Sequence, residues 1–340
     1  MSTMFRADLA HIGHYPDVTE RLTGERLWTF KAGKRIHSSP AIAGGRVYVG
    51  CANGCCYALD AETGRELWHF QTGDEVQSSP AVGDGKVYVG SGDGHLYALD
   101  ATTGAERWRF KTGSWIFSSP TLADGRVYVG SWDTHLYALD AQTGAECWRF
   151  KTGDKIESSP ALAGELLYVG SLDGLLYAIE ARTGRERWRF ATGGWVGSSP
   201  AVAEGVVYIG SSDRYLHALD AQTGAARWQF HAESWFSSSP AVAAGTVYVG
   251  SWNSYLYALR ADTGEERWRF KTGSWVFSSP AVAAGVVYVG SWDSQLYALD
   301  CQSGEERWRY QAGDALFSSP SLAPGLLCIG SHDGQLHALR

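Results

Sequence analysis

Short stretches of apolar residues alternate with glycine-containing turns along nearly the whole chain. In the first forty-residue unit, stretches rich in Val, Tyr, Leu and Trp predict strands at Ser38–Ala43, Arg46–Gly50, Cys55–Asp60 and Arg65–Phe70. No stretch has the hydrophobic period of an amphipathic helix, so helices are not expected. The pattern therefore predicts an all-β fold.

This strand pattern recurs with a period of forty residues, without an insertion or deletion. Four strands per repeat and eight repeats are typical of an eight-bladed β-propeller, in which each blade is a four-stranded antiparallel sheet that covers its neighbours. The clearest marker of the repeat is Ser-Ser-Pro, which ends at Pro40, Pro80, Pro120, Pro160, Pro200, Pro240, Pro280 and Pro320.

The two ends of the chain complement each other. The last repeat stops at the end of a third strand, at 336–340, while residues 23–30 form a fourth strand that precedes the first repeat. We expect this N-terminal strand to complete the last blade and close the ring, which removes an exposed sheet edge. Residues 23–340 are thus predicted to be one propeller domain, and residues 1–22 a leader that packs on or near the ring. The apolar residues of the leader are Phe5, Leu9, Ile12 and Tyr15.

Positions that are identical in all eight repeats serve something that every blade needs. One such column holds tryptophan, which we expect to pack between adjacent blades, and another holds a turn glycine for which we expect a positive φ. We interpret the serines of Ser-Ser-Pro as small residues packed at the narrow centre. The tryptophan column is Trp28, Trp68, Trp108, Trp148, Trp188, Trp228, Trp268 and Trp308.

The segment from Ala58 to Trp68 reads Ala-Leu-Asp-Ala-Glu-Thr-Gly-Arg-Glu-Leu-Trp. It resembles the Ala-x-Asp-x-x-Thr-Gly-x-x-x-Trp docking motif of the PQQ-like, quinoprotein-type β-propeller repeat family, and the motif recurs over residues 23–340. The resemblance implies a propeller, and its members include exported assembly scaffolds and longer, exported dehydrogenases that use a calcium-bound quinone. No insertion here matches their calcium ligands or catalytic aspartate, so no cofactor is predicted and PQQ with Ca²⁺ is not expected. Departures from the motif are Glu180, Arg260, Ser303 and Arg340.

The other seven tryptophans fall in two columns, one before the first strand of a blade and one after the second. Chain direction alternates along the strands, so both columns lie on one face, and exposed apolar patches tend to mark binding sites. Repeats 3 and 7 oppose each other in a ring of eight blades, so we predict that their aromatic side chains form a funnel. The alternative is that these side chains only fill the mouth of the central channel. The predicted ligand-binding residues are Trp115, Phe117, Trp132, Trp195, Trp235, Trp252, Tyr255, Trp275, Phe277 and Trp292.

The composition of the chain limits the classes of partner that we expect. The net charge of −7 offers no excess of basic residues for a phosphate backbone, so nucleic acid is not expected. No signal-peptide core or long apolar run occurs, so we predict a cytoplasmic location and no membrane partner. We also predict a monomer. The six cysteines are predicted to be free thiols, and the histidines lack the local spacing of a metal site.

Three functions remain open from the sequence. The first is a recognition propeller that binds a small molecule, peptide or protein through the funnel. The second is an enzyme that cyclises or isomerises a hydrophobic or cationic small molecule; its candidate catalytic residues are Glu157, Glu75 and His135, which replace different residues in the other repeats. The third is a PQQ-dependent oxidoreductase.

Overall fold

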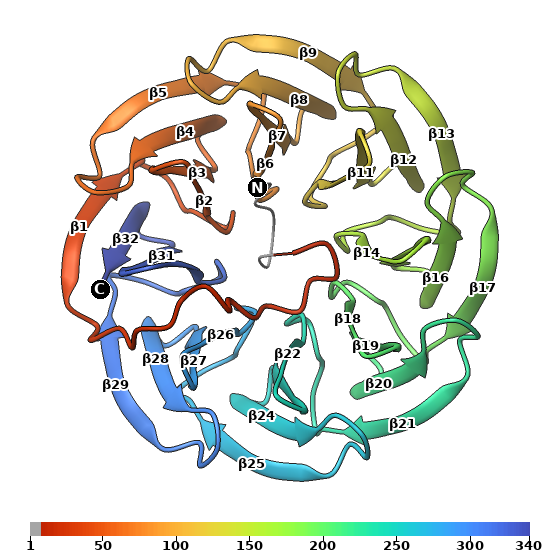
Figure 1. Ribbon diagram of the computed structural model, residues 1–340, viewed down its shortest axis with the longest axis vertical. Coiled ribbons are helices and arrows are strands. Elements are labelled where there is room, and N and C mark those ends of the chain that lie inside the picture. The colour runs from red at the N-terminus through yellow and green to blue at the C-terminus, as the bar shows by residue number, and fades with distance from the viewer. Residues whose placement is uncertain (1–7) are drawn as a thin grey trace.

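Eight four-stranded sheets surround a central axis in the computed structural model, which describes residues 8–340 (Figure 1). Every neighbouring pair of strands within a sheet is antiparallel, and the described residues contain no helix. The predicted eight-bladed propeller is therefore confirmed. No helix within residues 8–340 has the length and apolar character needed to cross a lipid bilayer.

Strands are numbered in chain order, and each blade runs from its innermost to its outermost strand. Blade 1 holds β2 (Ala41–Ala43), β3 (Arg46–Gly50), β4 (Cys55–Asp60) and β5 (Glu66–Gln71). Blade 2 holds β6 (Ala81–Gly83), β7 (Lys86–Gly90), β8 (His95–Asp100) and β9 (Glu106–Lys111). Blade 3 holds β10 (Thr121–Ala123), β11 (Arg126–Gly130), β12 (His135–Asp140) and β13 (Glu146–Lys151). Blade 4 holds β14 (Ala161–Ala163), β15 (Leu166–Gly170), β16 (Leu175–Glu180) and β17 (Glu186–Ala191).

The second half of the ring follows the same order. Blade 5 holds β18 (Ala201–Ala203), β19 (Val206–Gly210), β20 (Tyr215–Asp220) and β21 (Ala226–His231). Blade 6 holds β22 (Ala241–Ala243), β23 (Thr246–Gly250), β24 (Tyr255–Arg260) and β25 (Glu266–Lys271). Blade 7 holds β26 (Ala281–Ala283), β27 (Val286–Gly290), β28 (Gln295–Asp300) and β29 (Glu306–Gln311). Blade 8 holds β30 (Ser321–Ala323), β31 (Leu326–Gly330), β32 (Gln335–Leu339) and the N-terminal β1 (Arg26–Lys31).

The innermost strand is shorter than predicted. We expected a strand from Ser38, but β2 begins at Ala41. Pro40 has no N–H to donate to a ladder, and the Ser39 N–H donates to the Ser79 hydroxyl of the next blade instead of to β3. The serines therefore belong to the contacts between blades.

The N-terminal strand closes the ring as predicted. β1 pairs antiparallel with β32, with Trp28 opposite Ala338. Beside this pairing, Arg340 forms an ion pair with Glu25 at 2.6 Å, and the Trp308 indole N–H donates to the Leu22 carbonyl at 2.8 Å. The two ends of the chain thus hold each other in place within one sheet.

Each tryptophan of the repeated column joins its blade to the next one. The Trp68 indole N–H donates to the Ala101 carbonyl at 3.2 Å, and the ring lies against Gly104, where an added Cβ would come within 2.7 Å of Trp68 Cδ2. Gly104 also has a φ of +73°. The invariant glycine is therefore needed twice, for its backbone conformation and for the close approach of the indole.

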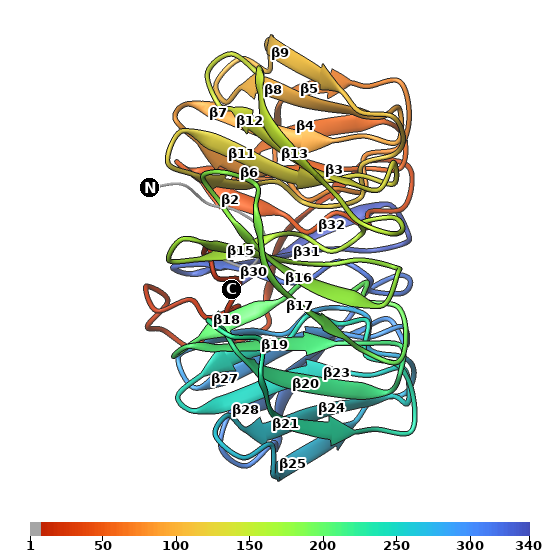
Figure 2. The same ribbon diagram turned by 90° about the vertical axis from the view of Figure 1, so that its right-hand side faces the viewer.

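The leader crosses the inner edges of four blades on one face of the disc (Figure 2). Its carbonyls accept hydrogen bonds from the innermost strands of blades 4 to 7, and Leu9, Ile12 and Tyr15 contact their apolar clusters. Phe5, which we counted among the apolar residues of the leader, lies outside the described residues. The bonds run from Leu162 N to Leu9 O, Val202 N to Ala10 O, Val242 N to Ile12 O and Val282 N to Gly13 O, at 2.7 to 2.8 Å.

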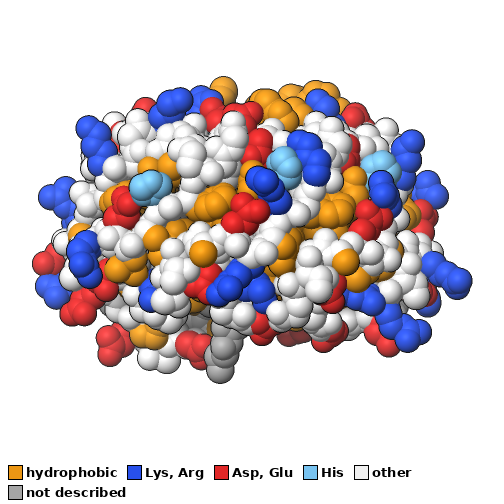
Figure 3. Space-filling view, turned by 90° about the horizontal axis from the view of Figure 1, so that it is seen from above, with side chains coloured by type: hydrophobic (Ala, Val, Ile, Leu, Met, Phe, Trp, Pro, Cys, Tyr) orange, Lys and Arg blue, Asp and Glu red, His pale blue; other side chains and the backbone are white. Residues whose placement is uncertain are grey.

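The outer wall of the disc carries acidic and basic side chains side by side (Figure 3). Many of them pair along the outermost strands, as Arg149 does with Glu146 at 2.8 Å and Arg189 with Glu186 at 2.7 Å. Such exposed pairs contribute little to stability, because water screens both charges. On the side of the wall seen in Figure 3, acidic and basic side chains are thus mixed.

Candidate functional site

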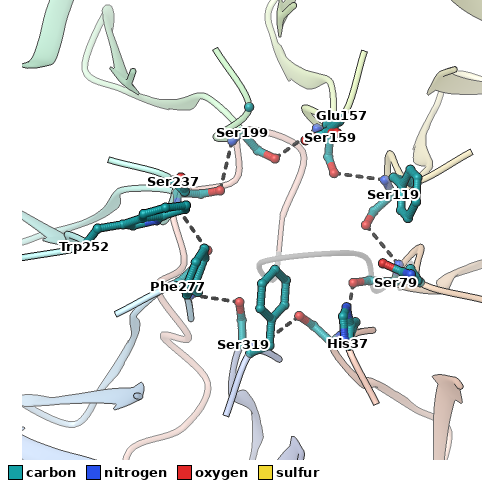
Figure 4. Close-up of a pocket in the computed structure, with 17 residues that line it drawn as sticks. His37, Ser79, Ser119, Glu157, Ser159, Ser199, Ser237, Trp252, Phe277 and Ser319 are labelled. Carbon is teal, nitrogen blue, oxygen red and sulfur yellow. Dashed lines mark hydrogen bonds between the residues drawn. The ribbon is translucent and has the colours of Figure 1, made fainter. Parts of the chain in front are cut away.

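A closed ring of serines surrounds the propeller axis (Figure 4). The backbone N–H of the second serine in each Ser-Ser-Pro donates to the hydroxyl oxygen of the same serine in the next blade, and the last bond returns from Ser319 to Ser39. The first serine accepts from a strand glycine, as Ser38 does from Gly50 N at 3.0 Å. Small-residue packing was thus an incomplete interpretation. The ring is Ser39, Ser79, Ser119, Ser159, Ser199, Ser239, Ser279 and Ser319, with bonds of 2.9 to 3.1 Å.

A pocket of about 480 Å³ lies on the axis, with the serine ring around it. The residue just before each Ser-Ser-Pro forms its wall, and Trp252 adds to it. In Figure 4 the coloured ribbon of the leader, from residue 8 on, passes behind this ring, so the pocket faces away from that part of the leader. The wall residues, in blade order, are His37, Gln77, Phe117, Glu157, Gly197, Ser237, Phe277 and Phe317.

One arc of the mouth is a continuous series of aromatic contacts. Trp235 lies 4.7 Å from Trp252, and Trp252 stacks on Trp275 with centroids 5.4 Å apart and planes at 18°. Trp275 in turn contacts Trp292 at 5.1 Å. Closer to the axis, Phe277 stacks on Phe317 at 5.0 Å, and Phe317 stacks on His37 at 4.8 Å. The arc therefore runs from blade 6 through blades 7 and 8 to blade 1.

A second aromatic cluster lies across the axis, at blades 3 and 4. Trp115 and Trp132 stack at 5.4 Å with planes at 16°, and Phe117 contacts Trp132 at 4.7 Å. The Lys155 ammonium lies 4.0 Å from the centroid of the Trp132 ring, a close cation–π contact. The two clusters correspond to the facing walls that the sequence predicted for blades 3 and 7.

Main-chain hydrogen bonds place the rim tryptophans on one face. Trp132 N donates to Trp115 O, and the same bond links Trp252 to Trp235 and Trp292 to Trp275, which ties the loop before a blade to the loop within it. Trp195 contacts Trp235 at 6.2 Å and is the most exposed of the rim indoles, at 58%. These indoles are neither buried between the sheets nor divided between two faces.

Two predicted residues lie away from the axial pocket. Tyr255 begins β24 and contacts Arg269, whose guanidinium lies 5.2 Å from the ring centroid. His135 begins β12, where its Nδ1 lies 3.0 Å from the Asp133 carbonyl, in a separate hollow with Tyr137. The structure does not bring either side chain to the funnel.

The two acidic candidates differ in environment. Glu157 lines the pocket, and burial raises the pKa of its carboxyl, while the Lys155 charge and the Trp132 indole oppose that shift. Glu75 lies behind the wall, where it pairs with Arg35 at 3.4 Å and accepts a hydrogen bond from Gln77 Nε2 at 2.7 Å. Of the three catalytic candidates, Glu157 is the one that faces the axis.

A stacked histidine pair ends the aromatic arc. His37 and His332 lie 4.6 Å apart with planes at 12°. Burial, then the neighbouring His332 and Arg35, lower the pKa of His37 to about 4, and burial lowers the pKa of His332 as well. The pair therefore adds aromatic surface, and no positive charge, to the pocket at neutral pH.

Three residues of the pocket wall were not predicted from the sequence. Phe317, Gly197 and Ser237 line the pocket but were not among the predicted residues. The signal that could have found them is the variability of their column, which holds His, Gln, Phe, Glu, Gly, Ser, Phe and Phe in the eight repeats. A column that varies next to an invariant Ser-Ser-Pro points toward the axis in every blade.

The pocket does not fit a calcium-bound quinone. PQQ is a tricarboxylate, and the lining contains no lysine or arginine to balance it, while His37 is neutral. Within residues 8–340, no group of three or more His, Cys, Asp or Glu side chains could hold a metal ion. The donor set required for that cofactor is therefore different from the one that lines this axis.

Comparisons with known proteins agree with this architecture. Residues 121–340 match the family described as the β-propeller of the beta-alanine-activating enzyme, which is more than half of the chain. Residues 15–78 and 52–155 match the family described as outer membrane protein assembly factor BamB. No curated protein matches the chain in a sequence comparison.

Solved structures share the fold at low sequence identity. BamB from Moraxella catarrhalis is 21% identical, with 94% of this chain and 100% of that chain covered and a TM-score of 0.81. Quinohemoprotein alcohol dehydrogenase from Comamonas testosteroni is 16% identical, with 99% and 80% covered and a TM-score of 0.86. The computationally designed Ika8 protein is 18% identical, with 93% and 99% covered and a TM-score of 0.84. These structures and the BamB match confirm the resemblance to PQQ-like propellers, and at these identities the structures show the fold alone.

Proposed function

The chain belongs to the β-propeller family described for the beta-alanine-activating enzyme, and on that premise we propose that it is a recognition propeller whose axial pocket binds a ligand that enters between the rim tryptophans. The single observation behind this proposal is the placement of the seven non-repeated tryptophans. They border one mouth of the axis, where a concave pocket of about 480 Å³ opens. A pocket of this size suits a small molecule or one side chain of a peptide.

The shape of the site favours insertion over a flat contact. The wall residues and the serine ring line one pocket, so a ligand that enters it contacts both aromatic surface and hydroxyl groups. Aromatic side chains contribute large contact area and lose few rotamers on binding. The BamB family, which this chain also matches, is described as an assembly factor, so a protein that inserts one side chain is within the proposal.

The proposal is tested by identifying the compound that is bound in the pocket of the purified protein. We expect the purified wild-type chain to release a small molecule or peptide on denaturation, detected by mass spectrometry, and a Trp115→Ala/Trp275→Ala variant to release at least tenfold less. The matched control is Leu27→Ala/Leu67→Ala, which removes two exposed apolar side chains from the outer strands. Equal recovery from both variants would contradict the proposal.

One observation favours a second candidate function, an enzyme. Glu157 is a carboxyl with a raised pKa inside an aromatic pocket, which is the environment of a general acid or base. If the pocket is catalytic, the bound compound leaves chemically changed, and Glu157→Gln retains binding but loses the change. Unchanged ligand recovered from both chains would leave recognition as the function.

Three further expectations stay predictions: a cytoplasmic location, a monomeric state, and the lack of nucleic-acid and membrane partners. An oxidoreductase that uses PQQ is not proposed, because the lining does not fit that group.

A further inference from the structure

Resting on the proposed function, we propose that the axial pocket selects an organic monocation, with the Glu157 carboxylate as its counter-ion and the surrounding aromatic faces as its cage. An ammonium or quaternary ammonium group on an apolar body has this chemistry. The proposal follows from the charge of the lining, the room beside the carboxylate and the arrangement of the aromatic rings.

The lining has one charged group. Its other polar members are serines, Gln77 and His37, and His37 is neutral because burial lowers its pKa to about 4. When ionised, Glu157 is therefore the one negative charge of the lining, on a half-buried side chain. An anionic ligand would be repelled there, whereas a monocation would neutralise the site.

The Lys155 charge acts on the Glu157 carboxyl, but the two do not form an ion pair. The Lys155 ammonium lies 4.0 Å from the centroid of the Trp132 ring, on the rim. Glu157 is not among the acids that form an ion pair with arginine, lysine or histidine within residues 8–340. A half-buried carboxylate that forms no ion pair leaves a place for a bound cation, which would supply the counter-charge.

Space for a ligand group lies beside the carboxylate. At the next wall position, Gly197 has no side chain, and an added Cβ would lie 3.6 Å from Glu157 Oε2 and 4.0 Å from Leu172. Those are ordinary van der Waals distances. A methyl or methylene group of a ligand can therefore contact the carboxylate there without moving the chain.

Aromatic side chains belong to the same lining. Phe117 precedes Glu157 in the ring, and Phe317 belongs to blade 8, four blades away from blade 4 and so across the axis. Phe277 stacks on Phe317 at 5.0 Å and contacts Trp252 at 4.6 Å, which extends the opposite wall. Aromatic rings attract a cation through their negative faces, and several rings around one carboxylate form a cage for an ammonium group.

The serine ring lets a primary ammonium be distinguished from a quaternary one. The Ser199 hydroxyl oxygen accepts one N–H, from Ser159, and keeps a second lone pair. A primary ammonium can donate to that oxygen and to Glu157, whereas a quaternary ammonium has no N–H and is held by the charge of Glu157 and the aromatic faces.

The experiment compares a cation with a neutral molecule of the same shape. Benzyltrimethylammonium, its carbon isostere neopentylbenzene, and benzylammonium are titrated into the full chain while tryptophan fluorescence is followed. We expect benzyltrimethylammonium to bind at least tenfold more tightly than neopentylbenzene. Tighter binding of benzylammonium than of its trimethylated form would assign the primary ammonium as the preferred class.

Two variants test the role of the carboxylate. Glu157→Gln should abolish the preference for the cation while thermal denaturation shows a folded chain. Glu165→Gln removes the same charge from an exposed turn of the same blade and should leave the preference unchanged. A preference that survives in Glu157→Gln would overturn the inference.

Failure of this inference is distinguishable from failure of the proposed function. If the neutral and charged probes bind equally, or if neither binds while a co-purified ligand is found, the cation preference is wrong and the pocket still binds. If neither probe binds and no ligand co-purifies, both proposals are wrong.

Discussion

The repeated tryptophans and the rim tryptophans are the same residue in two different roles. Trp108 has a fixed partner in the next blade, because its N–H donates to Ala141 O and its ring lies against Gly144. Trp195 has 58% of its surface exposed and contacts only another rim indole among the ring pairs. An identical contact in every blade marks a structural residue, whereas a tryptophan that occurs in some blades and stays exposed marks a site.

The hydrogen bonds of the indole N–H groups also distinguish the repeated tryptophans from the rim tryptophans. Seven of the eight repeated indoles donate to a carbonyl 33 residues further along the chain, as in Trp68 to Ala101, and Trp308 donates to Leu22 where the ring closes. Among the rim indoles, the buried N–H of Trp252 has no hydrogen-bond acceptor within residues 8–340. A satisfied N–H thus accompanies the structural role, whereas an unsatisfied one occurs at the rim.

The largest effect is expected from a repeated tryptophan. Trp108→Ala should lower the free energy of unfolding by about 3 to 5 kcal/mol, because it leaves a cavity between two blades. Urea unfolding followed by circular dichroism measures this loss. A loss below about 1 kcal/mol would break the comparison, because it would place Trp108 among residues that surface substitutions hardly affect.

A glycine pair isolates the indole contact. Gly144 and Gly125 have φ values of +73° and +71°, but an added Cβ at Gly144 would lie 2.6 Å from Trp108 Cε3, and at Gly125 it would meet nothing within 4 Å. We expect Gly144→Ala to cost about 2 to 4 kcal/mol and Gly125→Ala about 1 to 2. Equal losses in the unfolding measurement would mean that backbone strain alone explains the invariant glycine.

Acid should weaken the aromatic arc before it affects the blade junctions. The pKa of His37 in the folded chain is about 4, below its ordinary 6.5, so the unfolded chain takes up the proton first. Above pH 6.5, where His37 is neutral in both states, its burial does not reduce the free energy of unfolding. As the pH falls from 6.5 toward 4, the free energy of unfolding decreases by at most about 3 kcal/mol. His332, Arg35, Glu75 and Gln77 are the neighbours that act on it.

The measurement is the urea midpoint across that pH range. His37→Phe keeps a ring stacked on Phe317 and removes the titration, so its midpoint should fall less than that of the wild type. If the urea midpoints of the two chains fell equally with pH, protonation of His37 would not account for the loss of stability in acid.

The smallest effect is expected from an exposed rim tryptophan. Trp195→Ala should change the free energy of unfolding by no more than about 0.5 kcal/mol, because little of its surface is removed from water on folding. Measured beside Trp108→Ala under the same conditions, it gives the widest contrast between the two roles. A loss comparable to that of Trp108→Ala would assign the rim indoles to the scaffold.

Much of the fold could be predicted, and parts of the site could not. The second and third strands of the first blade have the predicted bounds, because their apolar residues and flanking glycines act locally. Tyr255 and His135 were assigned to the funnel from their loops, yet each begins a strand whose cross-strand neighbour is a lysine on the outermost strand. Side-chain direction at a strand end depends on that pairing, which loop position does not reveal.

The repeat by itself determined the number of blades, the closing strand and the face that carries the rim tryptophans, because each follows from a period of forty residues and from alternating chain direction. The tertiary structure decided that Glu157, Gly197 and Phe317 share one pocket and that the serines bond into a ring. Those contacts join residues far apart in the chain, and they form only when eight sheets close around a common axis.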